Sequence, residues 1–500
     1  MTKSNKFGST FAMSKLVRGV MGFFNSNSSQ IEPESGPLDR HQVIEPSAEQ
    51  IETLLSLFAG RRYPEVVSTA GKLSEQFPRH GFGWKMLGAG LIQSGFSSEA
   101  LLPLQKATAM LPLDPGPHYN LCSAFRSLGQ LDESAASGRR ALQIKPDFAE
   151  GHNNLAYTLY QLGELDQAEV LYRRALEIKP ECIEATWNLS ILLLAKGRYS
   201  EAWPLHESRY DPRMNDLIVT APNLPFPQWH GESLIGKSIL LWPEQGFGDC
   251  IQFIRYAKLL KARGVVRITL FCSPAIRPLL ETADGVDEVV TDIAQTASHD
   301  YWTFPASLPF YFGTTLDTIP DGFPYLHALP EKIEHWKKRL PAEGIKVGLV
   351  WKGNPTHNND ANRSLPGLST LAPLWRVPEV TFVSLQKWQA EDEAQTAALD
   401  QPLIHLGTDI VDFADTAAIV KQLDLVICVD TAIAHLAGAI GIPCWTLLPA
   451  CGVDWRWLRE RSDTPWYPNT TRLFRQTVPG DWTETILEVT EALRHKNIGG

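Results

Sequence analysis

The chain has 500 residues, of which 44% are apolar and 20% are charged, and its formal net charge is −10. This length predicts about two to four domains, and the negative charge argues against a general nucleic-acid-binding surface. No apolar run reaches the roughly 18 residues that a membrane-spanning helix needs. The seven cysteines are scattered without a CxxC pair. They argue against a zinc site or a disulfide scaffold and favour a reducing, cytoplasmic location.

Residues 1–46 are predicted to be a flexible basic leader and linker. Within residues 11–24, Lys15 and Arg18 interrupt an apolar run, so the segment is a poor signal peptide. As an amphipathic helix it would make a peripheral contact with a membrane or a partner. The alternative is a disordered leader with a transient helix. Residues 25–46 are rich in Ser, Glu and Pro, which is typical of a linker.

Residues 47–216 carry an internal repeat. Prolines recur at a constant step of 34 residues, at Pro78, Pro112, Pro146 and Pro180. Glycines keep the same step, at Gly95, Gly129, Gly163 and Gly197. Helix–turn–helix units of this period, with a small residue at the turn, resemble tetratricopeptide repeats. We expect five units, the first of them degenerate because Arg61 stands at the turn glycine.

One further position is an asparagine in three of the five units, at Asn120, Asn154 and Asn188. These residues would line the concave groove of the solenoid, where an amide can pair with the backbone of a bound polypeptide. Nucleocytoplasmic protein O-glycosyltransferases, which carry the same repeats, hold acceptor polypeptides with such asparagines. The alternative is that the three side chains only bridge neighbouring repeats.

After a linker around residues 221–229 the pattern changes to strands alternating with helices. A first Rossmann-like half is predicted for residues 235–330. Its elements are strands over 238–242, 266–271 and 286–291, helices over 251–263 and 275–282, and an irregular passage over 301–321. After a helix within 324–340, a second half covers residues 341–480. Its elements are strands over 346–351, 380–385, 403–406, 425–429 and 444–448, and helices near 368–375, over 416–422 and over 432–439.

A terminal helix is predicted over residues 481–496. The predicted fold class is therefore α + α/β, an α-solenoid followed by a GT-B-type pair of Rossmann-like domains. A cleft between the two halves is the expected site.

Asp249 is the candidate for proton transfer in the first half. It closes a Gly-rich turn that matches neither a dinucleotide fingerprint nor a P-loop. A carboxylate at this helix start could serve as general base toward an acceptor hydroxyl or amine. The alternative is a helix N-cap.

Donor-binding candidates follow three strands of the second half. The loop 352–364 offers Lys352 and Arg363 for phosphate, and Asn354 and His357 for a sugar or ribose. Gln386 and Lys387 end the next strand. We expect them to face the same cleft.

The stretch 424–449 reads as strand, turn, helix and strand. Asp430 and Thr431 follow a buried strand and open the helix, and His435 lies one turn along the same face. Parallel sheets bind phosphorylated ligands at such places; the alternative is an ordinary cap with a packed histidine. Asp412, with Asp415, precedes another helix and would reach a ribose or only cap that helix.

These motifs together resemble glycosyltransferases of the heptosyltransferase family. They are more similar still to bacterial fusions of tetratricopeptide repeats with such a domain. The resemblance covers residues 235–495. The segments that carry it are GFGD (246–249), Arg363-Ser364, SLQK (384–387), VDTAIAHLAGAIGIP (429–443), DWRW (454–457), TPWYP (464–468) and LFRQ (473–476).

The resemblance implies that the first half faces the acceptor and the second half binds the nucleotide sugar. Asp249 matches the family's general base. Asp430, Thr431 and His435 match its donor-binding motif. Ala432 stands where heptosyltransferases have glycine. A Cβ there opposes close approach of a phosphate to the backbone, which argues against an ADP-heptose donor.

The predicted function is glycosyl transfer from a nucleotide sugar, with inversion and without a cofactor. No D-x-D pair occurs, so no metal is expected at the diphosphate. Lys352, Arg363, Lys387 and the helix start at Thr431 would meet the leaving-group charge instead. The expected acceptor is a polypeptide such as flagellin, because some of these fusions glycosylate flagellin. The alternatives are a repeat scaffold with an inactive GT-B domain, or a transferase for lipopolysaccharide or capsule glycan.

Overall fold

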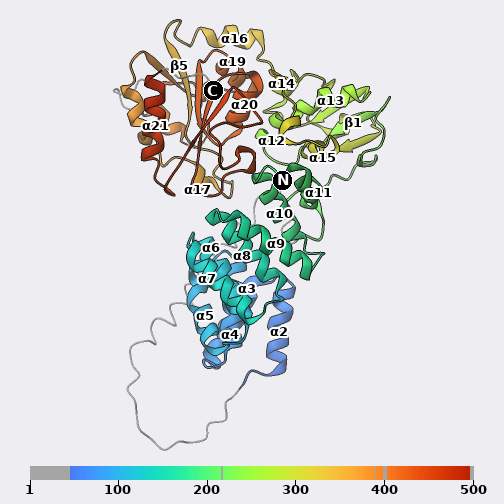
Figure 1. Ribbon diagram of the computed structural model, residues 1–500, viewed down its shortest axis with the longest axis vertical. Helices are drawn as coiled ribbons and strands as arrows, with labels where there is room; N and C mark the ends of the chain where they lie inside the picture. The colour runs from blue at the N-terminus through green and yellow to red at the C-terminus, as the bar shows by residue number, and fades with distance from the viewer. Residues whose placement is uncertain (1–44, 215–217, 389, 398–402, 496–500) are drawn as a thin grey trace, which may run out of the picture. The chain divides into compact units, whose positions relative to one another are not determined.

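The computed structural model describes residues 45–214, 218–388, 390–397 and 403–495 (Figure 1). The leader up to residue 44, with the predicted membrane contact of residues 11–24, lies outside the described residues. The chain divides into two compact units, with the boundary between Asn188 and Leu189. Among the described residues, no helix has both the length and the apolar character needed to cross a membrane.

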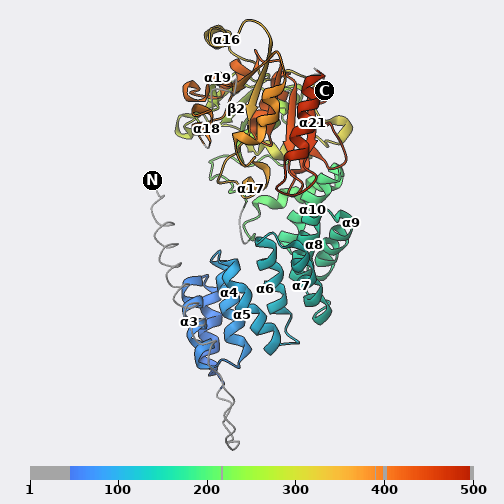
Figure 2. The same cartoon turned by 90° about the vertical axis from the view of Figure 1, so that its left-hand side faces the viewer.

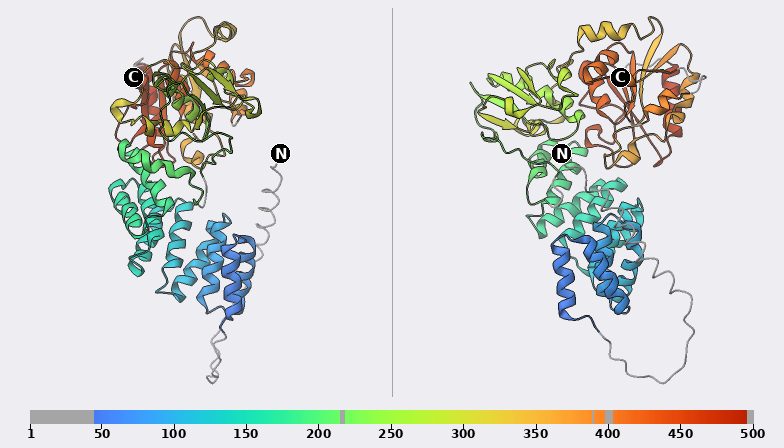
Figure 3. Two further views of the ribbon diagram at one scale, coloured as in Figure 1. Left: turned by 90° about the vertical axis from the view of Figure 1, so that its right-hand side faces the viewer. Right: turned by 180° about the vertical axis from the view of Figure 1, so that it is seen from behind.

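The first unit is a succession of antiparallel helices, each packed against the next (Figures 2 and 3). They are α2 Ala48–Ala59, α3 Tyr63–Gln76, α4 Gly81–Gln93, α5 Ser97–Met110, α6 Pro115–Ser127, α7 Leu131–Ile144, α8 Ala149–Leu162 and α9 Leu165–Ile178. The boundary between the units falls inside α10, Ile183–Ala195. This arrangement confirms the predicted α-solenoid.

The predicted turn positions adopt the left-handed backbone that glycine favours. Gly95, Gly129 and Gly163 have φ of 84°, 74° and 86°. In the degenerate first repeat Arg61 takes the same conformation, with φ of 55°. The turn is therefore kept where the glycine is lost, at the strain that a side chain brings in this region.

The second unit begins with the end of the fifth repeat. Helix α11 spans Tyr199–His206, and a 3-10 turn, η1, follows over Glu207–Tyr210. The repeat pattern fades after Ala202, yet the helix continues for four more residues. The fifth repeat, which the sequence groups with the solenoid, is thus divided between the two units.

Four parallel strands form the first sheet, in the order β3-β2-β1-β4. They are β1 Ser238–Leu241, β2 Arg267–Phe271, β3 Glu288–Val290 and β4 Tyr301–Thr303. The prediction of an irregular passage over 301–321 is wrong at its start, because β4 pairs with β1. The pairing with β1, rather than a strand pattern in the sequence, gives this segment its structure. After β4 come η4 Pro305–Ser307, α15 Leu308–Tyr311 and η5 Leu316–Thr318.

The helices of this half are shorter than predicted. The helix expected over 251–263 begins earlier and is broken, as α12 Phe247–Phe253, η2 Ile254–Tyr256 and α13 Ala257–Ala262. Helix α14 covers only Arg277–Leu280. Asp249 therefore lies in the first turn of α12, at its third residue.

Six parallel strands form the second sheet, in the order β10-β9-β8-β5-β6-β7. They are β5 Ile345–Val350, β6 Val380–Ser384, β7 Leu403–His405, β8 Leu425–Val429, β9 Cys444–Leu448 and β10 Thr471–Arg475. Numbered within this half, the order is 3-2-1-4-5-6, the arrangement of dinucleotide-binding sheets. Its topological switch point lies between β5 and β8.

Helices cover this sheet and position its loops. They are α16 Pro330–Lys337, α17 Asp360–Arg363, η6 Leu368–Arg376, α18 Glu391–Gln395, η7 Gly407–Asp409, α19 Phe413–Val420, α20 Ala432–Ile440, η8 Trp455–Trp457 and α21 Thr483–Arg494. Ile427 of β8 shares a buried core with Leu371 of η6 and Ile486 of α21, and Figure 1 shows α21 against the sheet. The α + α/β prediction is confirmed. The predicted helix near 368–375 is a 3-10 helix, with Pro373 inside it.

Candidate functional site

The site lies where α12 of the first half packs against α20 of the second. A Cβ placed on Gly248 would come within 2.8 Å of His435 Cδ2 and 3.6 Å of Ala432 Cα. The absence of a side chain at Gly248 thus permits the two helix starts to meet. This contact brings Asp249 to the carboxyl end of β8, beside the switch point where open α/β sheets bind ligands.

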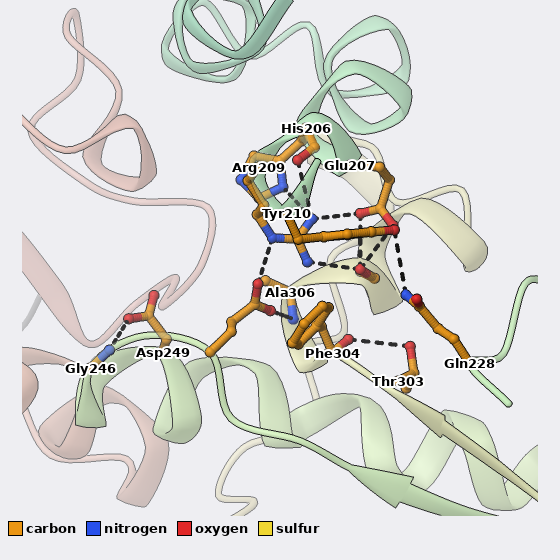
Figure 4. Close-up of polar contacts among 12 residues, drawn as sticks. His206, Glu207, Arg209, Tyr210, Gln228, Gly246, Asp249, Thr303, Phe304 and Ala306 are labelled. Atoms are coloured by element: carbon orange, nitrogen blue, oxygen red, sulfur yellow. Dashed lines mark hydrogen bonds and ion pairs between the residues drawn. The ribbon is translucent and has the colours of Figure 1, made fainter. Parts of the chain in front are cut away.

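The Asp249 carboxylate contacts both halves. One oxygen accepts a hydrogen bond from the Gly246 N–H at 2.9 Å, as Figure 4 shows. The other oxygen pairs with the Arg456 guanidinium. Burial raises the pKa of Asp249, and the charge of Arg456 acts in the opposite direction. The side chain is 19% exposed, so a ligand in the site has limited access to it.

Arg456 is a residue to which the sequence analysis assigned no role. It donates to Asp454 at 2.9 and 3.0 Å and also to the Gln252 side chain. Burial alone would lower the pKa of Arg456, but the carboxylates of Asp454 and Asp249 raise it overall. The guanidinium therefore remains a cation that joins α12 to η8. The DWRW motif marks Arg456 in the sequence, but the motif does not indicate which carboxylate pairs with the arginine.

The start of α20 forms the side of the site opposite α12. Thr431 caps the helix, and its Oγ1 accepts from the Ile433 N–H at 3.3 Å. Arg363 donates from Nη1 to the Asp430 carbonyl at 3.0 Å. The structure therefore brings together Arg363, Asp430 and Thr431, as predicted for the switch point. Burial raises the pKa of Asp430 to about 6, and the nearby Asp454 carboxylate adds to the effect.

His435 packs inside the protein. Its Nδ1 lies 2.9 Å from the Tyr467 hydroxyl, and its ring stacks on Trp457 at a centroid distance of 5.3 Å. Burial lowers the pKa of His435 well below its usual value, so the ring is neutral. These contacts agree with the alternative of a packed histidine rather than a cationic phosphate ligand.

His357 adds a second neutral ring to this region. Burial lowers its pKa first, and the neighbouring Arg363 lowers it further. From the sequence it was expected to help orient a sugar or ribose, which stays a prediction. With His357 and His435 neutral, Arg363 and Arg456 supply the positive charge that borders Asp249 and Asp430.

The other donor-binding candidates bond to the protein's own loops. Gln386 is buried, and its Oε1 accepts from the N–H groups of Trp351 and Lys352, each at 3.1 Å. It ties the end of β5 to the end of β6. Lys387 Nζ donates to the Gly407 carbonyl at 2.7 Å.

Lys352 and Asn354 are likewise engaged within the loop 352–366. Lys352 Nζ donates to the Pro366 carbonyl at 2.9 Å. Asn354 is exposed, and its Oδ1 accepts from the Thr356 N–H at 3.0 Å. These two hydrogen bonds lead to Pro366 and Thr356 rather than to Asp430 or Thr431.

Asp412 acts as a helix cap. Its Oδ1 accepts from the N–H groups of Ala414 and Asp415 at 2.9 and 3.0 Å, at the start of α19. Asp415 itself is buried and accepts from Lys332 at 2.8 Å and from Trp336 at 3.0 Å. The structure thus agrees with the capping alternative for Asp412.

Two of the three repeat asparagines contact the preceding repeat within the first unit. Asn154 donates to Ser123 Oγ at 2.9 Å, and Asn188 donates to Asn153 Oδ1 at 3.0 Å. Asn120 is half-buried. The amide N–H groups therefore bridge repeats, as the alternative predicts, and binding of an acceptor by this row stays a prediction.

Comparisons with known proteins confirm the repeats. A family model described as tetratricopeptide repeat matches residues 149–182, and one described as TPR repeat matches residues 123–163. Protein FlbA of Caulobacter vibrioides is 29% identical over 328 residues, which are 59% of this chain and 52% of that protein. The chain thus spans about half the length of this curated relative.

Solved structures of tetratricopeptide-repeat proteins match about a third of this chain. A thermophilic TPR protein of Thermus thermophilus, TTC0263, is 22% identical and matches 34% of this chain and 92% of its own, with a TM-score of 0.31. PilF of Pseudomonas aeruginosa is 15% identical and matches 32% of this chain and 73% of its own, with a TM-score of 0.30.

Proposed function

We propose that this chain is a glycosyltransferase that moves a sugar from a nucleotide-sugar donor to an acceptor polypeptide. The observation that carries the proposal is the meeting of α12 and α20 at the switch point of the six-stranded sheet. It sets Asp249, through its neighbour Gly248, against the start of α20, where Arg363 donates to the Asp430 carbonyl. Transfer from a nucleotide donor requires a base for the acceptor and an anion-binding site for the leaving phosphate. Asp249 and the start of α20 would supply these two groups.

The proposed step is a single displacement with inversion. Asp249 accepts the proton of the acceptor hydroxyl while that oxygen attacks the anomeric carbon. The bond from this carbon to the phosphate oxygen of the nucleotide breaks at the same time. Arg363 and the N–H groups at the start of α20 offset the charge that develops on the leaving phosphate. Burial, which raises the pKa of Asp249, makes the carboxylate a better proton acceptor.

The repeats fit a polypeptide acceptor, since tetratricopeptide repeats bind peptide or protein partners in a concave surface. Flagellin is the acceptor that we propose, from the resemblance to repeat-fused transferases. Intact-mass analysis of flagellin co-expressed with this chain tests the choice. A mass increase equal to one or more sugars supports it, whereas modification of lipopolysaccharide or capsule alone would favour a glycan acceptor.

The enzymatic proposal is tested with Asp249→Asn in the full chain. We expect transfer to fall by about 10²- to 10⁴-fold, because the base is lost, while calorimetry shows an unchanged affinity for the donor. Asp317→Asn is the matched control, since Asp317 is exposed, and it should keep full transfer. Equal turnover of the Asp249→Asn variant and its parent would remove Asp249 from the mechanism.

A second candidate function is a repeat scaffold with an inactive α/β unit. It is favoured by the Asp249 carboxylate, whose two oxygens are already engaged by Gly246 and Arg456, and by Ala432 at the start of α20. Titration with UDP-, GDP-, ADP- and CMP-sugars separates the two functions. Binding of none of these donors would favour the scaffold.

A further inference from the structure

The last turns of the fifth repeat enclose a buried arginine. Arg209 of η1 is 0% exposed, and each of its guanidinium nitrogens donates within the second unit (Figure 4). Nε donates to Glu244 at 2.5 Å, Nη1 to Glu207 at 2.7 Å, and Nη2 to Ser307 Oγ at 2.8 Å. A planar guanidinium with all its nitrogens bonded is held in one orientation.

Glu244 connects Arg209 to the candidate site. It lies in the turn between β1 and α12, is 2% exposed, and its second oxygen accepts from the Ala306 N–H at 2.9 Å. Burial raises the pKa of Glu244, and the charge of Arg209 opposes this effect. Two residues further along the same turn, Gly246 donates its N–H to the Asp249 carboxylate. Arg209 therefore fixes the turn that presents one of the two partners of Asp249.

The aromatic face of α11 meets the segment that presents the other partner. The Tyr199 hydroxyl accepts from Trp466 Nε1 at 2.9 Å. Trp203 packs edge-to-face on Trp455 at a centroid distance of 5.6 Å, and its Nε1 donates to the Thr314 carbonyl at 2.8 Å. Trp455 directly precedes Arg456, the ion-pair partner of Asp249.

We infer that residues 199–210, although they continue the repeat in sequence, form a positioning element of the candidate site. Arg209, acting through Glu244, and Trp203, acting through Trp455, hold the two groups that orient the Asp249 carboxylate. The consequence for transfer rests on the proposed function. The consequence for the conformation of α12 does not, and it can be measured without a substrate.

The test is hydrogen exchange of the full chain carrying Arg209→Gln. The amides of Asp249 and Cys250 donate to the Gly246 carbonyl at 3.2 and 3.3 Å, so they report on the first turn of α12. We expect a peptide covering residues 246–253 to exchange at least tenfold faster, while a peptide covering residues 425–440 is unchanged. Arg213→Gln is the matched control. Arg213 pairs with Asp211 in the next few residues, but its side chain is 66% exposed, and we expect no change.

The outcomes separate a positioning role from a stabilising one. Unchanged exchange at 246–253, or an equal rise in both peptides, would overturn the inference. Removing one partner of a buried ion pair can unfold a protein, whereas removing both charges is often tolerated. If Arg209→Gln does not fold, the double variant Arg209→Met, Glu244→Met replaces it, with the same expectation for 246–253 and the same contrary results.

A transfer assay adds a second readout. With the Arg209→Gln variant we expect kcat to fall at least tenfold with an unchanged donor KM, and the acidic limb of the pH profile to move. A fall in Tm with an unchanged pH profile would assign Arg209 to stability alone. If the parent chain transfers no sugar, the proposed function fails, while the exchange experiment still decides the positioning role.

Discussion

In the repeats, polar contacts between helices join residues about one repeat apart in the chain, whereas the ion pair that closes the candidate site joins residues about two hundred apart. Asn154 and Ser123 are separated by 31 positions, but Arg456 and Asp249 by 207. Repeat units contact mainly their neighbours, so a substitution there disturbs one layer. In the α/β unit, each contact that positions a functional group occurs at one place only and is not repeated along the chain. One substitution there is therefore expected to disturb the whole site.

The largest expected effect is that of Gly438→Ala in α20. A Cβ at this position would overlap the buried ring of Tyr467, which also holds His435. We expect a loss of about 3 kcal/mol in unfolding free energy, because a rigid ring cannot yield to the new methyl group. Calorimetric unfolding of the full chain measures it. If Gly438→Ala left the unfolding free energy unchanged, this side of the site would tolerate substitution as a repeat does.

A smaller effect is expected from the charge of Asp430. Its pKa in the folded chain, about 6, lies above the usual 3.8, so the folded state binds the proton more tightly than the unfolded state. Stability should therefore fall as the pH rises from about 4 through about 6. Asp430→Asn removes this penalty and should gain about 2 kcal/mol above pH 7 but nothing near pH 4. Parallel curves of stability against pH for parent and variant would contradict this.

Gly88→Ala makes the corresponding change in the repeats. A Cβ at Gly88 of α4 would overlap the Leu104 side chain, but an aliphatic chain can turn aside, and alanine favours the helix. We expect a net loss of only about 1 kcal/mol. The same calorimetric measurement applies. A loss as large as that of Gly438→Ala would erase the contrast between the two regions.

The smallest effect is expected for Asn154→Ala. The substitution removes the half-buried hydrogen bond to Ser123, which is worth about 0.5 kcal/mol of unfolding free energy. Ser127→Ala is a control in the adjacent repeat, because the Ser127 hydroxyl bonds within its own helix. If the row of asparagines also binds the acceptor, Asn154→Ala raises the acceptor KM and Ser127→Ala does not. If both variants raised the acceptor KM, the effect would belong to the solenoid as a whole rather than to the Asn154 amide.

The repeats could be predicted because each position recurs. Even the irregular first turn was visible, since Arg61 stands where later repeats have glycine and still adopts φ of 55°. Most parallel strands of the α/β unit were also predictable from their buried runs. The strands β4 and β10 were not predicted, and they gain their structure from pairing with β1 and β9.

The candidate site was predictable only in part. The end of a buried strand located Asp430 and Thr431, but residue types cannot show which partner a side chain finds. His435 and Asp412 had two interpretations each, and tertiary contacts with Tyr467 and with the start of α19 distinguish them. The pairing of Asp249 with Arg456 depends on two segments that meet only after folding, so no local pattern contains it.

The turn glycines carry a consequence for how such a chain can change in length. A side chain added at Gly95 or Gly129 would meet no neighbouring atom within 4 Å, so only the backbone conformation constrains these turns. At Gly197 the same Cβ would lie 2.9 Å from Leu316 Cδ1, in the passage that follows β4. Duplication or deletion of a 34-residue cassette between the earlier turns would alter the number of repeats and leave the α/β unit intact. The fifth turn is outside this exchangeable set, because recombination there would have to rebuild its contact with the α/β unit.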